Sequence, residues 1–165
     1  MKKIVFTLFC LLLAVGANAQ QVTKTTHKKA VKTDVVTTGT MTVRKPNYIC
    51  ISTDNGRDQL IMDGTQFTMT MGGKKHVTDS RKNPQFATFQ AVLEAVINGR
   101  PIPQSEDLTV TTKGSEQTIT ITPTGKKRRQ MFTGFTLVVD SKTSAFRLLR
   151  MNDRSGGYTE YTFKK

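Results

Sequence analysis

Gln59-Leu60-Ile61-Met62-Asp63-Gly64-Thr65-Gln66-Phe67-Thr68-Met69-Thr70-Met71 is the stretch that decides the fold. Apolar and polar side chains largely alternate on both sides of Asp63-Gly64, and this period of two is typical of half-buried β-strands. Asp-Gly tolerates the backbone conformations that a tight hairpin requires. The stretch therefore predicts two antiparallel strands, over Gln59–Met62 and Gln66–Met71.

The same alternation, rich in Thr, Val, Ile and Phe, recurs along most of the chain, and these residues suit a pleated surface. It predicts seven further strands: Val35–Arg44, Tyr48–Thr53, Leu108–Lys113, Gln117–Pro123, Gln130–Asp140, Ala145–Asn152 and Tyr158–Phe163. Turn residues separate them, at Asp54-Asn55-Gly56, Lys113-Gly114, Thr124-Gly125 and Ser155-Gly156-Gly157. Consecutive hairpins of this kind form an antiparallel meander, so we predict a mainly β protein with a single curved sheet.

One segment has the helical period instead. Asn83-Pro84 supplies an N-cap and a first-turn proline, and Gly99 marks the far end. An apolar stripe on this predicted helix, Pro84–Asn98, consists of Phe86, Phe89, Leu93 and Val96. The helix is amphipathic, and we expect its apolar face to lie on the sheet.

The N-terminus has the features of a secretory signal. Lys2 and Lys3 precede the apolar run Ile4–Val15, and Ala17-Asn18-Ala19 offers a cleavage site after Ala19. Residues 1–19 are therefore expected to be removed on export to the periplasm. Residues 20–34 are basic and are expected to form an arm or an edge strand, and residues 35–165 form the domain. No later stretch is long and apolar enough to span a bilayer, so we expect no membrane-spanning segment.

The sequence contains few residues that are suited to catalysis or metal binding. His27 and His76 are the only histidines and lie among lysines, and no cysteine, histidine or carboxylate spacing is typical of a metal site. We therefore expect no catalytic residues, no metal and no cofactor. After residues 1–19, Cys50 is the one cysteine, so no internal disulfide is available, and Ile49 and Ile51 beside it favour a buried thiol.

The charge points to acidic partners. The formal net charge is +13, and removal of Lys2 and Lys3 lowers it to +11. The densest basic run, Lys126–Arg129, follows a turn and contains no aromatic residue. A solvated hairpin tip explains this run more simply than a nucleic-acid site, for which stacking aromatics are typical. Lipid head groups or acidic glycans remain as partners.

Methionine is frequent on the predicted strands. Phe67, Met69 and Met71 share one face of their strand, Met41 and Val43 share a face of another, and Met62 lies nearby. Flexible, polarisable methionines suit a surface that receives variable acyl chains, but they also fill gaps in ordinary cores. Both interpretations stay open on these residues alone.

Two longer stretches resemble a known family. Gly39-Thr40-Met41-Thr42-Val43-Arg44-Lys45-Pro46-Asn47, followed by Asp58–Phe67, is similar to segments of the outer-membrane lipoprotein carrier (LolA-like) family. Phe135–Asp140, Met151-Asn152-Asp153, Gly156 and Thr159–Phe163 resemble its last strands. The resemblance covers about Val35 to Phe163.

This resemblance implies an open, half-closed antiparallel β-barrel whose apolar concave face is covered by a helical lid. Carriers of this family hold the acyl chains of lipoproteins, which they receive from an inner-membrane ATP-driven transporter and pass to an outer-membrane acceptor. Carried over by position and strand face, the cavity would be lined by Met41, Val43, Ile49, Ile51, Met62, Phe67, Met69 and Met71. The lid would be formed by Phe86, Phe89, Leu93 and Val96.

The chain departs from the family at two points. Lys45 stands where the family has an arginine that hydrogen-bonds the lid, and the long N-terminal helix of the family is missing. A lysine lacks the planar fork of donors of an arginine. If Lys45 is the lid latch, the latch is weak, and the cavity is expected to stay partly open without a ligand.

Two functional hypotheses follow. The first is a monomeric periplasmic carrier that binds the acyl chains of lipoproteins, or another lipid, and shuttles them towards the outer membrane. The alternative is a basic, non-enzymatic envelope module that binds acidic glycans or lipid head groups through Lys126–Arg129 and the arm Lys24–Lys32. Salt separates the two, because it screens exposed charges and leaves apolar burial intact.

Overall fold

The computed structural model describes residues 19–123 and 131–164 of the chain. Its strands are β1 (Gln20–His27), β2 (Val35–Arg44), β3 (Tyr48–Thr53), β4 (Asp58–Asp63), β5 (Gln66–Met71), β6 (Lys74–Asp79), β7 (Leu108–Lys113), β8 (Glu116–Ile121), β9 (Phe132–Asp140), β10 (Phe146–Asp153) and β11 (Tyr158–Phe163). A short 3-10 turn, η1 (Asp54–Gly56), links β3 to β4, and the helix α1 (Pro84–Ile97) follows β6.

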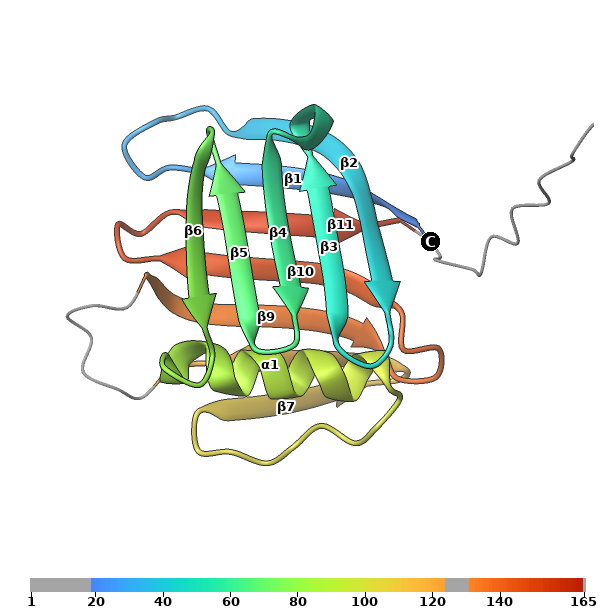
Figure 1. Cartoon of the computed structure of the whole chain (residues 1–165). Helices are drawn as coiled ribbons and strands as arrows, with labels where there is room; N and C mark the ends of the chain where they lie inside the picture. The colour runs from blue at the N-terminus through green and yellow to red at the C-terminus, as the bar shows by residue number, and fades with distance from the viewer. Residues whose placement is uncertain (1–18, 124–130, 165) are drawn as a thin grey trace, which may run out of the picture.

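All eleven strands form one antiparallel sheet in the order β6-β5-β4-β3-β2-β1-β11-β10-β9-β8-β7. The sheet is open, because β6 and β7 are its two edges and do not pair with each other. It folds over itself, so that β3 to β6 cross in front of β9 to β11, and α1 runs across the lower ends of β3 to β6, above β7 (Figure 1). The prediction of a mainly β, open antiparallel sheet with one α-helix is confirmed.

The hairpin around Asp63-Gly64, formed by β4 and β5, has the predicted structure. Met62 pairs with Phe67 and Leu60 with Met69, in direct register across the turn. Gly64 has a φ of 58°, which is the conformation that the Asp-Gly turn requires. The predicted helix also begins at Pro84, and it ends one residue earlier than expected, at Ile97.

Residues 20–34 were predicted to form an arm or an edge strand, and the structure corrects this prediction. β1 lies in the middle of the sheet and pairs with β2 on one side and β11 on the other. The Thr-rich composition concealed it, because only Val22 of its inward residues is apolar and the other buried position is Lys24. The strand β6 was also missed, since its charged residues lie exposed at the edge of the sheet.

Strand alternation explains a second correction. Ile49 and Ile51 point into the core, so the intervening Cys50 lies on the opposite face of β3 and is only half-buried. The expectation of a buried thiol was therefore wrong. The predicted signal sequence, the Thr124-Gly125 turn and the run Lys126–Arg129 lie outside the described residues.

Candidate functional site

The concave interior of the sheet is the candidate site. Ten of the twelve predicted lining and lid residues are buried in one apolar core, and Val43 and Met71 are partly buried against it. The buried ten are Met41, Ile49, Ile51, Met62, Phe67, Met69, Phe86, Phe89, Leu93 and Val96. The structure thus brings together all the residues that the sequence placed on the concave face.

The interior holds almost no free space. Its cavity measures about 10 Å³, which is about the room that one water molecule needs. The cavity is lined by Met41, Ile49, Ile51, Leu60, Met62, Phe67, Phe89, Leu93, Leu137, Phe146, Leu149 and Phe163. The expectation of a partly open cavity is therefore wrong for this structure, because the apolar face of α1 fills the half-barrel.

Five of these lining residues were not predicted from the sequence as part of the site: Leu60, Leu137, Phe146, Leu149 and Phe163. Four of them belong to β9, β10 and β11, which were predicted as strands without a face assignment. The period of two in β9, where Phe135, Leu137 and Val139 are buried, was a usable signal. In β10 a register irregularity between Phe146 and Leu148 breaks that period and conceals the inward face.

Stacked aromatic rings hold α1 inside the sheet. The ring of Phe89 lies 4.5 Å from that of Phe135 at an interplanar angle of 10°, and 5.7 Å from the ring of Phe67. Phe86 contacts Phe67 at 5.0 Å between centroids and Phe132 edge-on at 6.2 Å. Such pairs add about 0.5–1.5 kcal/mol each beyond burial, so α1 is a well-packed part of the core.

Polar contacts fasten both ends of α1. Near its start, the buried Gln85 Oε1 accepts a hydrogen bond from the Phe132 backbone N–H at 3.4 Å, and the Ser80 hydroxyl donates to Gln90. At its end, Asn98 Nδ2 donates to the backbone carbonyl of Pro46 at 2.7 Å. This last bond joins the helix to the turn between β2 and β3.

Lys45, the predicted latch, makes no such contact. Its side chain is exposed, and no hydrogen bond or ion pair joins it to α1 in the part of the chain that the structure describes. The helix is instead hydrogen-bonded one residue further on, where the Pro46 carbonyl accepts from Asn98. A backbone acceptor leaves no side-chain signal, so the sequence could not identify it.

A surface groove of about 380 Å³ opens at the end of the half-barrel where β1 begins and α1 ends. Met41 and Phe146 line both this groove and the interior cavity. The other lining residues are Ala19, Gln20, Val43, Ile97, Thr143, Ser144 and Ala145. We call this groove the mouth, because its two shared residues separate the interior from solvent.

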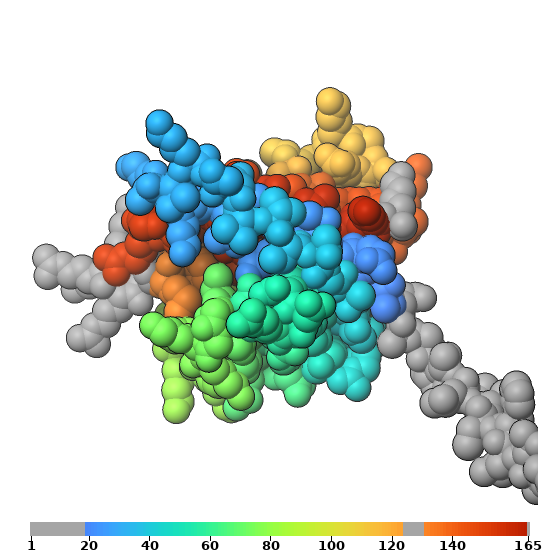
Figure 2. All heavy atoms as spheres, turned by 90° about the horizontal axis from the view of Figure 1, so that it is seen from above, coloured from blue at the N-terminus to red at the C-terminus, as the bar shows by residue number. Residues whose placement is uncertain are grey.

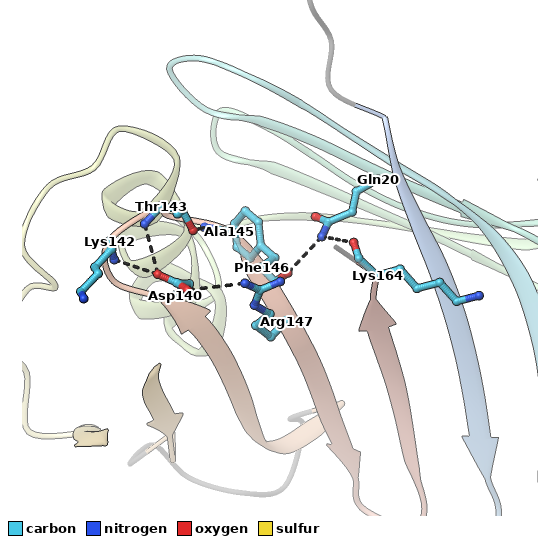
Figure 3. Close-up of polar contacts among 8 residues, drawn as sticks. All are labelled: Gln20, Asp140, Lys142, Thr143, Ala145, Phe146, Arg147 and Lys164. Atoms are coloured by element: carbon cyan, nitrogen blue, oxygen red, sulfur yellow. Dashed lines mark hydrogen bonds and ion pairs between the residues drawn. The ribbon is translucent and has the colours of Figure 1, made fainter. Parts of the chain in front are cut away.

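The rim of the mouth is braced by hydrogen bonds (Figure 3). Asp140 Oδ1 accepts from the backbone N–H of Lys142 at 2.9 Å and of Thr143 at 3.2 Å. The hydrogen bond from the Lys142 N–H lowers the pKa of Asp140, and those from the Thr143 N–H and the Arg147 side chain lower it further. Desolvation raises this pKa, but the hydrogen bonds outweigh it. On the other side, Gln20 Nε2 donates to the backbone carbonyls of Lys164 at 2.6 Å and Phe146 at 3.3 Å.

The inward face of the sheet also contains a polar pair. Lys24 of β1 is 4% exposed, and its Nζ donates to Asp58 Oδ2 at 2.6 Å. Burial pulls the pKa of Asp58 upward, but hydrogen bonds from Lys24 and from the Gly72 N–H outweigh it, and the pKa is lowered. Burial, with the charge of Asp58, raises the pKa of Tyr161, which pairs with Lys24 across β1 and β11. The inward face of the sheet thus contains one buried ion pair, and neither of its residues lines the mouth.

Within residues 19–123 and 131–164, no three His, Cys, Asp or Glu side chains gather closely enough to hold a metal ion. Over the same residues, no helix has the length and hydrophobicity needed to cross a bilayer.

The chain thus forms an open antiparallel half-barrel with an apolar interior and a helix packed inside it. Residues 14–165 of the sequence match the family described as outer membrane lipoprotein carrier protein LolA. The chain therefore belongs to the LolA family. No match was found among curated proteins.

Several solved structures resemble the chain over most of its length. A LolA superfamily protein from Nitrosomonas europaea is 10% identical to this chain, with a TM-score of 0.34. The match covers 89% of this chain and 83% of that protein. LprF from Mycobacterium bovis is 11% identical, with 91% and 85% covered and a TM-score of 0.36. A putative outer membrane lipoprotein-sorting protein domain from Vibrio parahaemolyticus is 9% identical, with 92% and 85% covered and a TM-score of 0.34. Because these values are low, the family assignment rests on the sequence match.

Proposed function

We propose that the protein is a periplasmic carrier that holds the acyl chains of lipoproteins, or of another lipid, inside the half-barrel and shuttles them towards the outer membrane. The observation that carries the proposal is the apolar interior, which reaches the surface at the mouth through Met41 and Phe146. Membership of the LolA family supports the class of cargo. The proposal includes no catalytic step, and binding and release alone account for the activity.

The lid predicted from the sequence becomes, in this proposal, an internal plug. Since the cavity holds about 10 Å³, an acyl chain enters only if Phe89 and Leu93 of α1 leave their places. The helix and the cargo then compete for the same apolar surface. This competition keeps the interior covered when no cargo is bound, which protects the protein from aggregation.

The energy of this exchange is adequate for a carrier. Burial of about ten methylene groups contributes about 8 kcal/mol at about 0.8 kcal/mol each, which corresponds to a micromolar dissociation constant. Displacement of α1 subtracts from that figure, so the cargo is held reversibly. A reversible hold is what transfer from an inner-membrane ATP-driven transporter to an outer-membrane acceptor requires.

The test is uptake of a fluorescent fatty acid by the delipidated chain from Gln20 onward, with native mass spectrometry of the purified protein for retained lipid. We expect saturable uptake that persists at high salt, because acyl burial is not screened. Binding of acidic glycans that is lost at high salt, without fatty acid uptake, would support the basic envelope module instead. Absence of uptake and of retained lipid would refute the carrier.

A further inference from the structure

The hairpin loop between β1 and β2 is the most exposed apolar segment of the described chain. Residues 28–36 are all exposed, and they include Val31 at 48%, Val35 at 60% and Val36 at 59%. These are three of the six large hydrophobic residues that are exposed among the described residues. Three exposed valines within six residues are a local concentration of apolar surface, and such surface is typical of an interaction site.

The same loop is basic. Lys28, Lys29 and Lys32 lie on the same segment as the valines, and the one acidic residue, Asp34, is 2.7 Å from His27 Nδ1. Val35 and Val36 are neighbours whose side chains point to opposite faces of β2, yet both are exposed. This end of the hairpin therefore extends past the body of the protein, as the blue segment in Figure 2 shows.

The base of the hairpin is fixed. The His27 ring stacks on the ring of Tyr158 in β11, with 5.0 Å between the centroids. The Arg150 guanidinium lies 3.9 Å from the centroid of the Tyr158 ring. Glycine is required at 157, because an added Cβ would lie 2.4 Å from the His27 carbonyl oxygen. The lysines and valines are thus presented by an ordered support, which lowers the entropic cost of binding.

We propose that the β1–β2 hairpin docks the protein on an anionic lipid bilayer, with the valines at the level of the head groups and the lysines against the lipid phosphates. The chemistry favours a bilayer over a protein partner, because lysine is depleted from protein interfaces and the aromatic and arginine anchors of such interfaces are absent from this loop. Near an anionic membrane surface each lysine instead strengthens binding about fivefold. The formal net charge, which is +11 once Lys2 and Lys3 are removed, adds a long-range attraction to an anionic surface.

This docking is independent of the carrier function. The hairpin lies at the far end of β1 from Gln20, and therefore at the opposite end from the mouth. Docking through it holds the protein at a membrane surface and leaves the mouth facing away from the lipids.

The test is co-sedimentation of the chain from Gln20 onward with vesicles of phosphatidylcholine alone or mixed with phosphatidylglycerol. We expect binding only to the anionic vesicles, with a loss of about a hundredfold in the triple variant K28Q/K29Q/K32Q, at about fivefold for each lysine. The double variant V35S/V36S should lose about tenfold, because the two side chains are only partly buried at the interface.

Matched controls come from the sheet edges. The variant K74Q/K75Q/K113Q removes the same charge from exposed positions of β6 and β7, and V77S/V110S removes exposed valines. Both should bind vesicles like the unaltered chain, and the hairpin variants should retain fatty acid uptake. Equal binding to both kinds of vesicle, no binding to either, or an equal loss in hairpin variants and controls would overturn the proposal.

Discussion

Lys24 and Asp58 form an ion pair of 2.6 Å that joins the middle strand of the sheet to the start of β4 inside the half-barrel. The lysine is almost fully buried, and the carboxylate keeps a little access to solvent. β2 and β3 lie between the two strands. The pair therefore ties two parts of the curved sheet that no backbone ladder connects directly.

Removal of this cation should destabilise the fold. Lys24→Met leaves the Asp58 carboxylate without its partner, and we expect the free energy of unfolding to fall by about 2–3 kcal/mol. Breaking a fully buried pair costs about 3–5 kcal/mol, and the cost is smaller here because the Gly72 N–H still donates to Asp58. Urea unfolding measures the loss. The double variant K24M/D58N should lose less than the sum of its single variants, and a cost of K24M under about 0.5 kcal/mol would contradict the interpretation.

The pair also predicts the direction of acid sensitivity. The pKa of Asp58 is lowered in the folded state from its model-compound value of 3.8, so its stabilising contribution is complete above that value and is lost as the pH falls through the folded pKa. Between neutral pH and about pH 3, the unaltered chain should therefore lose more stability than Asp58→Asn. Parallel pH profiles of the two proteins in urea unfolding would count against this role.

The hydrogen bond between Asn98 and the Pro46 carbonyl should control the release of α1. Asn98→Ala removes it at a cost of about 1 kcal/mol, so we expect fatty acid uptake about fivefold faster in stopped-flow fluorescence. Lys45→Leu is the matched control, since Lys45 is exposed beside the same turn, and it should leave the rate unchanged. The reverse result, with Lys45→Leu faster and Asn98→Ala unaltered, would restore Lys45 as the latch.

The mouth should be the route of the acyl chain. Val43 is partly buried at this groove, so Val43→Glu places a charge on the path and should reduce fatty acid affinity at least tenfold, because a desolvated carboxylate is costly. Val110→Glu, on the exposed face of β7, is the control and should bind normally. Thermal unfolding of both variants distinguishes a blocked path from a lost fold, and normal affinity in Val43→Glu would exclude this route.

The sequence allowed the strands with strong alternation and clear turns to be predicted, as in the hairpin around Asp63-Gly64. It failed where a buried position is polar: β1 faces inward with Lys24, and its partner Asp58 is 34 residues away in the chain. The inward set of residues was largely predictable because a period of two assigns each residue to a face. How fully α1 fills the interior depends on side-chain packing between segments far apart, which periodicity does not encode.

In the proposed carrier, an acyl chain occupies the interior in place of α1. The direct measurement is a titration of the methyl-labelled protein with a spin-labelled fatty acid, observed by NMR. Signals of the interior residues Ile51, Met62 and Leu149 should broaden strongly, while those of the exposed Val77 and Val110 should stay sharp. Broadening confined to exposed valines, with the interior signals unaffected, would show that the lipid binds on the surface and would contradict the account.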